Sequence, residues 1–393
     1  MGLETGSKQC IIPAMKLICA PMATISHPAF RIMIEKFGGC DEYYNEMINA
    51  PSLLNMGPFE KYYIDPSPVP EKMVWQLTGK DIRPMVEASK IVAALPGLFV
   101  DLNMGCCAPE IVRSGAGIAW MLKERRETES LVREVSSIVN SPEYKKKLSV
   151  KLRLGDENFT DEGFFSFCDM LVQNGVSRIT LHPRTKKEKY RDKPRYEYVQ
   201  KLCERYKGQK VEIILNGDIK DEQSLKKALS VCPDCSGIMV GRGAVSKPWI
   251  FKELRNALDS SEVSGTADTA AESAPANSTG GGLPAESIAS GALPENRMPV
   301  DGMLSDAPPA AGTLNTTVDA LSLALSYIDD VMRYQPPEFW KTRLQRFFTY
   351  YSENFSFAHY LKSGLLNAQT PEESRKILEE YFKKVPQDLN LGV

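Results

Sequence analysis

The amino-acid sequence predicts a closed (β/α)₈ barrel, the TIM barrel, followed by a small C-terminal all-α helical domain. Short β-branched or apolar runs recur eight times between residues 11 and 258, and amphipathic stretches long enough for helices lie between them. Several runs are almost continuously apolar, as expected for strands buried on both faces of a parallel sheet. Eight strand-then-helix repeats in about 240 residues suit a closed barrel. The competing fold is a doubly wound open sheet, and no Gly-x-Gly-x-x-Gly turn follows the first run to support it.

The predicted strands come first in each repeat. They are residues 16–22, 42–48, 73–79, 98–105, 148–155, 178–184, 212–219 and 237–244. Helical patterns between them cover residues 29–37, 83–95, 127–139, 163–174 and 223–231.

Residues 259–318 differ in composition from the rest of the chain. They are rich in Ala, Ser, Gly, Pro and Thr and contain no Phe, Tyr or Trp, so they cannot bury enough apolar area to offset the entropy of ordering. We expect a flexible linker between a catalytic barrel at 11–258 and a helical domain at 319–393. The linker has eight acidic residues and one basic residue, a net charge of −7, which leaves +5 for the remainder of a chain whose total is −2.

The overall composition is that of a globular protein, with 42% apolar residues. No run of about 18 apolar residues and no leader pattern is present, so we expect a cytoplasmic protein without membrane contact. Nine scattered cysteines favour reduced thiols over a disulfide framework. Cys232 and Cys235 have the spacing of a metal-binding pair, but no second pair or nearby histidine completes a site, so we expect no metal.

Polar residues gather at the carboxyl ends of the predicted strands, where barrels of this kind place their chemistry. Charged groups converging on one mouth cost free energy unless they are paired or solvated, so an active site explains them better than a structural role. In chain order these strand-end residues are Ala20, Pro21, Met22, Gln76, Asn103, Gly105, Cys106, Lys151, Arg153, His182, Arg184, Asn216, Gly217, Asp218, Gly241, Arg242 and Gly243.

The last two strand ends indicate a phosphate site. Gly217, Gly241 and Gly243 would let backbone amides approach a phosphate, and the loops after strands seven and eight are the usual phosphate cradle of this fold. Arg242 would add charge-assisted hydrogen bonds. A reduced flavin also needs a cation near its N1 and C2 carbonyl, and Lys151 is the natural candidate.

Seven short motifs complete the pattern. They are Ala20-Pro21-Met22, Gln76-Leu77-Thr78-Gly79, Asn103-Met104-Gly105-Cys106, Lys151-Leu152-Arg153, His182-Pro183-Arg184, Asn216-Gly217-Asp218 and Gly241-Arg242-Gly243. In this order they resemble the motifs of the tRNA-dihydrouridine synthase family, over about residues 14–255. The resemblance implies FMN in the barrel mouth, NADPH as reductant and tRNA as substrate. It also implies that the helical tail is a tRNA-binding domain.

The resemblance further implies a mechanism and a role for each matched residue. Hydride would pass from flavin N5 to C6 of a uracil, and Cys106 would protonate C5 from the opposite face. A thiol with an ordinary pKa near 8.5 is mostly neutral at pH 7 and able to donate. The family usually has proline after its cysteine, whereas this chain has Cys107, a possible competitor of Cys106. The flavin contacts would come from Ala20, Pro21, Met22, Gln76, Lys151, His182, Asn216, Gly217, Asp218, Gly241 and Arg242. The uracil contacts would come from Asn103, Arg153 and Arg184. Lys151 would contact both the flavin and the uracil.

Two basic regions would hold the RNA around a flipped-out base. One is the loop at 186–195, with Lys186, Lys187 and Lys189. The other is a helical stripe of Arg343, Arg346 and Tyr350, beside a second stripe of Leu344, Phe347, Phe348 and Tyr351 that should face a core.

Two other functions remain open from the residues alone. A flavin barrel acting on a free pyrimidine shares the cofactor logic, but it needs neither the basic loop nor the tail. A tRNA-binding module without chemistry would not need the Asn103 to Cys106 segment or Lys151. We expect a monomer.

Overall fold

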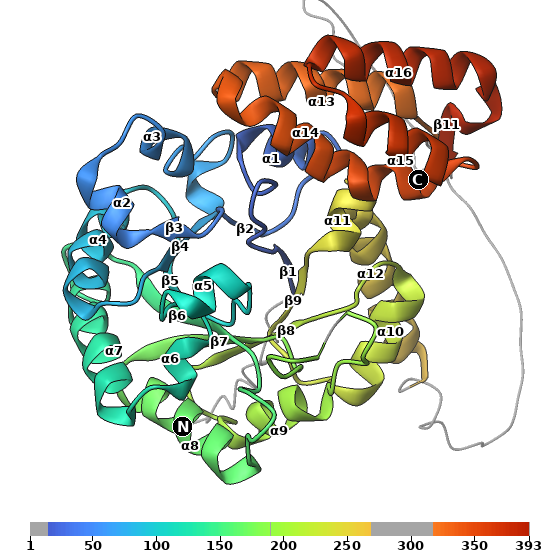
Figure 1. Cartoon of the computed structure of the whole chain (residues 1–393). Helices are drawn as coiled ribbons and strands as arrows, with labels where there is room; N and C mark the ends of the chain where they lie inside the picture. Colours follow the sequence, from blue (N-terminus) through green and yellow to red (C-terminus); the bar gives the residue numbers. More distant parts are fainter. Residues whose placement is uncertain (1–14, 189, 269–316, 393) are drawn as a thin grey trace, which may run out of the picture.

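The computed structural model describes residues 15–188, 190–268 and 317–392, and its centre is a closed parallel barrel (Figure 1). Neighbouring strands run in the order β1, β2, β4, β5, β6, β7, β8, β9, and the pairing of β9 with β1 closes the ring. This confirms the predicted fold class. The eight strands are β1 (Lys16–Cys19), β2 (Glu42–Tyr44), β4 (Met73–Thr78), β5 (Phe99–Met104), β6 (Lys147–Leu152), β7 (Val176–Leu181), β8 (Glu212–Asn216) and β9 (Gly237–Val240).

Helices surround the barrel on the outside (Figure 1). The longer ones are α1 (Pro28–Glu35), α4 (Ile82–Ala94), α7 (Arg125–Val139), α8 (Asp161–Gln173), α9 (Glu197–Arg205), α10 (Glu222–Val231) and α12 (Ile250–Asp268). Shorter pieces are α2 (Ala50–Asn55), α3 (Glu60–Tyr63), α5 (Pro109–Arg113), α6 (Ala119–Leu122), α11 (Arg242–Ser246) and the 3₁₀ turn η1 (Pro70–Lys72). Side-chain caps start two of the longer helices: Thr160 accepts from the Gly163 amide, and Asp221 accepts from the Ser224 amide.

The strands are shorter at their carboxyl ends than the sequence predicted. β1, for example, ends at Cys19 instead of residue 22, and β9 ends at Val240 instead of 244. The second predicted strand, 42–48, divides into β2 and the two-residue β3 (Ile48–Asn49). The residues lost from the strands form the loops above the barrel.

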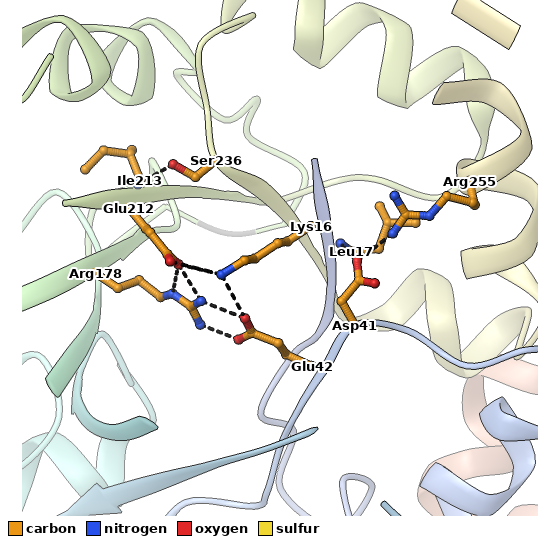
Figure 2. Close-up of polar contacts among 9 residues, drawn as sticks. All are labelled: Lys16, Leu17, Asp41, Glu42, Arg178, Glu212, Ile213, Ser236 and Arg255. Carbon is orange, nitrogen blue, oxygen red and sulfur yellow. Dashed lines mark hydrogen bonds and ion pairs between the residues drawn. The ribbon is translucent and has the colours of Figure 1, made fainter. Parts of the chain in front are cut away.

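The amino-terminal end of the barrel is closed by an ion cluster (Figure 2). Arg178 on β7 is fully buried and donates to the carboxylates of Glu42 on β2 and Glu212 on β8. The Lys16 ammonium on β1 lies 2.9 Å from Glu212 Oε1 and 3.3 Å from Glu42 Oε1. Each buried charge therefore has an opposite charge in contact, which is what makes its burial tolerable.

The C-terminal region is a helical group packed against α1 and α11 (Figure 1). Its predicted core residues Leu344, Phe347, Phe348 and Tyr351 are all buried. The elements are β10 (Thr317–Asp319), α13 (Ala320–Tyr334), α14 (Pro337–Tyr351), η2 (Ser352–Asn354), α15 (Ala358–Asn367), α16 (Pro371–Lys384), η3 (Pro386–Asp388) and β11 (Asn390–Gly392), with β10 and β11 antiparallel.

The boundaries of the predicted linker fall at the edge of the described chain. α12 continues to Asp268, past the expected start of the linker at 259, and β10 begins at Thr317. Residues 269–316, most of the predicted linker, lie outside the described residues, so the linker stays a prediction. In the described part of the chain, no helix has the length and apolar character needed to cross a membrane.

Candidate active site

A cavity of about 890 Å³ opens at the carboxyl ends of the barrel strands. Loops after β1, β5, β7, β8 and β9 form most of its wall, and α14 adds Arg346 and Tyr350 from the helical region. All eleven residues predicted to bind the cofactor line this cavity: Ala20, Pro21, Met22, Gln76, Lys151, His182, Asn216, Gly217, Asp218, Gly241 and Arg242. The catalytic candidate Cys106 lines it too.

The cavity wall carries more positive than negative charge. Six lining side chains are Lys or Arg and three are Asp or Glu. Asp218 is already engaged, because its carboxylate accepts hydrogen bonds from both Arg184 and Arg242. A low-dielectric cavity with an excess of cations favours an anionic ligand.

Lys151 is the clearest unsatisfied group in this wall. Burial and, after it, the neighbouring Arg153 lower the pKa of its ammonium to about 8, while Asp101 opposes both effects. Within the described part of the chain, no side chain or backbone group accepts a hydrogen bond from the Lys151 ammonium. An anion bound in the cavity would supply the missing partner and raise that pKa again.

His182 is held neutral and in one tautomer. Burial lowers the pKa of its imidazole far below the ordinary value, and the nearby cations Lys151, Arg153, Arg184 and Arg242 add to this effect. The Nε2 atom lies 3.0 Å from Nη1 of Arg184. A guanidinium only donates, so Nε2 accepts and the ring proton sits on Nδ1. His182 thus offers a hydrogen-bond donor at the cavity.

Glycines bring the backbone close to the cavity after β8 and β9. Gly217 has φ +136°, and a Cβ there would lie 3.1 Å from the His182 ring. Gly241 has room around it: an added Cβ would meet only Ala20 and Met22, both at 3.6 Å, and would take space in the cavity that they share. Gly243 is instead required by packing, because an added Cβ would lie 2.6 Å from the Ile219 carbonyl oxygen.

Cys106 and Cys107 both reach the cavity. Burial raises the pKa of the Cys106 thiol, with Cys107 and Glu110 adding to the rise against the hydrogen bond from Ala108 and the Lys151 charge. The Cys106 thiol is therefore protonated at neutral pH and can act as an acid.

Asn103 grips the loop that carries Cys106. Its Oδ1 accepts from the amides of Gly105 at 3.2 Å and Cys106 at 2.9 Å. Its Nδ2 donates to Gln76 Oε1 at 2.9 Å and contacts Met47 Sδ at 3.6 Å. Asn103 was predicted as a substrate contact, and the structure shows that it also fixes the cysteine loop.

Known proteins resemble the barrel part of this chain in sequence. The model of the family described as "Dihydrouridine synthase (Dus)" matches residues 18–282. The chain belongs to the dihydrouridine synthase family. A relative from Aquifex aeolicus, "Probable tRNA-dihydrouridine synthase", is 32% identical over 246 residues, which are 62% of this chain and 74% of that protein. One of the same name from Helicobacter pylori is 31% identical over 244 residues, 61% of this chain and 70% of its own.

Solved structures also match, but with low sequence identity and low structural similarity. Morphinone reductase is 10% identical, with a TM-score of 0.41, and the match covers 61% of this chain and 85% of that one. The family match contains every residue of the cavity wall that comes from the barrel, whereas Arg346, Tyr350, Glu353 and Asn354 lie beyond it.

The structure corrects two of the predicted substrate contacts in this family member. Arg184 is fully buried and does not line the cavity; it donates to Asp218 and to the Asp192 carbonyl oxygen. Arg343 is 2% exposed and forms an ion pair with Glu46, so it cannot face RNA. Both side chains hold loops of the site in place instead of contacting a ligand.

The other predicted substrate contacts have different positions. Arg153 and Arg346 line the cavity. Lys186 is half-buried and Lys187 is exposed and paired with Glu157, both outside the cavity wall. Lys189 lies outside the described residues.

The sequence patterns did not single out several residues of the wall, among them Tyr190, Met47, Lys220 and Lys247. The Tyr190 ring lies 3.7 Å beneath the Arg242 guanidinium, although its side chain is largely exposed. Tyr190 stood in the basic loop as its only aromatic residue, which was the signal available. Met47 follows Glu46 in a segment predicted to be strand, and no local pattern marked it.

Proposed function

We infer that this chain reduces the C5=C6 bond of specific uridines in tRNA, using FMN and NADPH. The observation that carries this proposal is the position of a protonated thiol, Cys106, in the same cavity as Lys151 and His182. Family membership supplies the reaction class, and the cavity supplies the groups that this reaction needs.

The cavity fits a flavin mononucleotide. Its volume lies within the roughly 300–1,000 Å³ usual for cofactor sites. The phosphate would lie at Gly217, Gly241 and Arg242, where the backbone has no side chain in the way. Lys151 would face the pyrimidine edge of the ring, where negative charge develops on reduction, and His182 would donate from Nδ1. Bound FMN would accept hydride from NADPH and supply it to uracil C6.

Cys106 would then deliver the proton to C5. The thiol gives up its proton as the new C–H bond forms, and the resulting thiolate is reprotonated from solvent. Its raised pKa suits this role, because the group must carry a proton before the reaction. Arg153 lines the cavity with its Nη1 donating to the Thr185 carbonyl oxygen at 3.0 Å, and it would bind a uracil carbonyl.

The RNA would approach across the barrel mouth and α14. A stacked uridine has both faces covered, so the base must be flipped into the cavity. Arg346 is exposed on α14 with its guanidinium 5.9 Å from the Tyr350 ring, and both residues reach the cavity rim. A cation beside an aromatic ring is suited to a phosphate and an unstacked base.

The test is dihydrouridine mapping in tRNA from a strain that lacks this gene. Restoring the unaltered gene should recover dihydrouridine at one or a few positions, and Cys106→Ala should recover little. Cys107→Ala is the matched control and should recover nearly as much as the unaltered gene. Equal recovery by Cys106→Ala and the unaltered gene would remove Cys106 from its proposed role.

A biochemical arm separates the rival function. Purified protein loaded with FMN should oxidise NADPH in the presence of unmodified tRNA and be idle with free uracil or uridine. Fast turnover with the free pyrimidine and none with tRNA would overturn the proposal in favour of a small-molecule enzyme.

A further inference from the structure

We propose that Asp101, a buried carboxylate behind the cavity wall, is a positioning residue for Cys106. It would act by fixing which way the side-chain amides of Gln76 and Asn103 point. The proposal rests on the proposed function for its catalytic meaning, although its structural part can be tested without any reaction.

Asp101 lies on β5, two residues before Asn103, and its side chain is completely buried. It is not among the residues that line the cavity. Its Oδ1 accepts from the Ser149 hydroxyl at 2.6 Å, and its Oδ2 accepts from Gln76 Nε2 at 2.8 Å. An ionised carboxylate can only accept, so it obliges Gln76 to turn its NH₂ group inward.

The direction set by Asp101 passes along the chain of hydrogen bonds. With its NH₂ turned to Asp101, Gln76 presents Oε1 to Asn103 Nδ2 at 2.9 Å. Asn103 must then present its own oxygen to the amides of Gly105 and Cys106. Gln76 and Asn103 are 1% and 8% exposed, so solvent from the cavity that they line has little access to the place of a lost partner in this row.

Reversing the side-chain amides of Gln76 and Asn103 in this row of hydrogen bonds would place donor groups opposite donor groups. A flipped Asn103 would aim its NH₂ at two backbone N–H groups, and the loop would lose the anchor at the Cys106 amide. The Cys106 carbonyl oxygen would still accept from the Ile118 amide at 3.0 Å, and the thiol would keep its hydrogen bond from Ala108. Buried donors left unsatisfied are costly enough to shift a loop.

Burial raises the pKa of Asp101 to about 6, against the hydrogen bonds from Ser149 and Gln76 and the charges of Lys151 and Arg178. Protonation would not reverse the row, because the Ser149 hydroxyl can rotate and accept from the new O–H while Oδ2 still accepts from Gln76. The positioning of Cys106 by Asp101 therefore depends on a hydrogen-bond acceptor at Oδ2 and not on the charge of the carboxylate.

The first test compares two substitutions of Asp101. Asp101→Asn can turn its NH₂ to Ser149 and keep its oxygen towards Gln76, so it should behave within about twofold of the unaltered chain. Asp101→Leu removes the acceptor, and the alkylation rate of the Cys106 thiol in FMN-free protein should change by at least about fivefold. Cys10→Ser and Cys107→Ser in every variant, with the alkylated residue identified by peptide mass spectrometry, make the reading specific to Cys106, because the other described cysteines are buried.

The second test is a rescue that does not depend on whether Asp101→Leu folds. Gln76→Glu sets two carboxylates against each other and should disturb Cys106 alkylation. Adding Asp101→Asn reverses the hydrogen bond between positions 101 and 76 but keeps the rest of the row, because the introduced amide would donate to the introduced carboxylate, and that carboxylate would still accept from Asn103. The alkylation rate should then return to within about twofold of the starting value.

The same variants are then measured with FMN, NADPH and tRNA. We expect Asp101→Leu to lower kcat by at least about fivefold at saturating tRNA, with the flavin absorbance retained and the KM for tRNA little changed. Unchanged Cys106 alkylation in Asp101→Leu, or no rescue in the double variant, would overturn the positioning role. An unaltered chain that leaves tRNA unreduced would refute the proposed function, while the alkylation results would still decide the role of Asp101.

Discussion

Arg178→Met should destabilise this barrel more than any exposed ion-pair change. The guanidinium is fully buried, and it donates twice to Glu42 and twice to Glu212. Among the described residues, removing it leaves Glu42, which is 2% exposed, with the Lys16 ammonium at 3.3 Å as its one remaining cation. Breaking a buried pair in this way typically costs about 3–5 kcal/mol. Because Lys16 remains, we expect a value near the lower end, about 3 kcal/mol.

The assay is urea unfolding followed by far-UV circular dichroism, with the free energy of unfolding extrapolated to water. Lys16→Met is the matched control, since its side chain is 32% exposed and Arg178 would still hold both carboxylates. We expect that control to cost less than about 1 kcal/mol. Adding Glu42→Leu to Arg178→Met should recover most of the loss, because no buried charge is then left unpaired. A loss below about 1 kcal/mol for Arg178→Met, or one equal to that of Lys16→Met, would refute the reasoning.

Three further predictions concern charge and packing. Burial hinders ionisation of Glu212, but Arg178 and Lys16 outweigh burial and lower the pKa of its carboxyl below 4.5. The stabilising contribution of Glu212 is therefore complete above pH 4.5 and is lost as the pH falls through the lower folded-state pKa. Unfolding measured across an acid titration should show this loss in the unaltered chain and less of it in Arg178→Met. Lys151 should take up a proton when FMN binds, so the Kd for FMN should rise by up to about tenfold per pH unit above pH 8 in fluorescence titrations. Lys151→Met should abolish this pH dependence. Gly243→Ala should lower the free energy of unfolding by about 1–3 kcal/mol in thermal unfolding, because its Cβ would clash with the Ile219 carbonyl oxygen. Gly241→Ala should keep stability and weaken FMN binding. Equal stability losses in the two variants would contradict the assigned packing role of Gly243.

The fold was predictable because each strand of the barrel is buried on both faces. Nearly continuous apolar runs such as 98–105 and 212–219 therefore stand out without any knowledge of their partners. The carboxyl ends were overestimated for a related reason. The loop above β1 continues with Pro21 and Met22, and α11 after β9 contains Ala244; these residues line or adjoin the cavity and keep the apolar character of the strand.

Contacts between distant segments were not predictable in the same way. Residues 45–47 carry a strand-like pattern, yet Glu46 leaves the sheet to accept from the Thr24 amide and to pair with Arg343, which lies 297 positions later. Arg343 and Arg346 lie on the same face of a helix, and the sequence alone does not show which part of that face packs against the barrel. Arg343 is buried and pairs with Glu46, whereas Arg346, one turn further along α14, is exposed.

Two lysines inside the same barrel show why ligand chemistry belongs to one end. Lys16, at the amino-terminal end, lies against the carboxylates of Glu42 and Glu212, so the cluster there is closed and has no need of a further anion. Lys151, near the other end, is at least as enclosed, yet among the described residues it has no contacting carboxylate. Folding the chain therefore leaves a desolvated cation at the cavity that only a ligand can match. An anion bound beside Lys151 would offset part of the free energy lost in burying that ammonium, so the proposed anionic cofactor would also stabilise the folded protein.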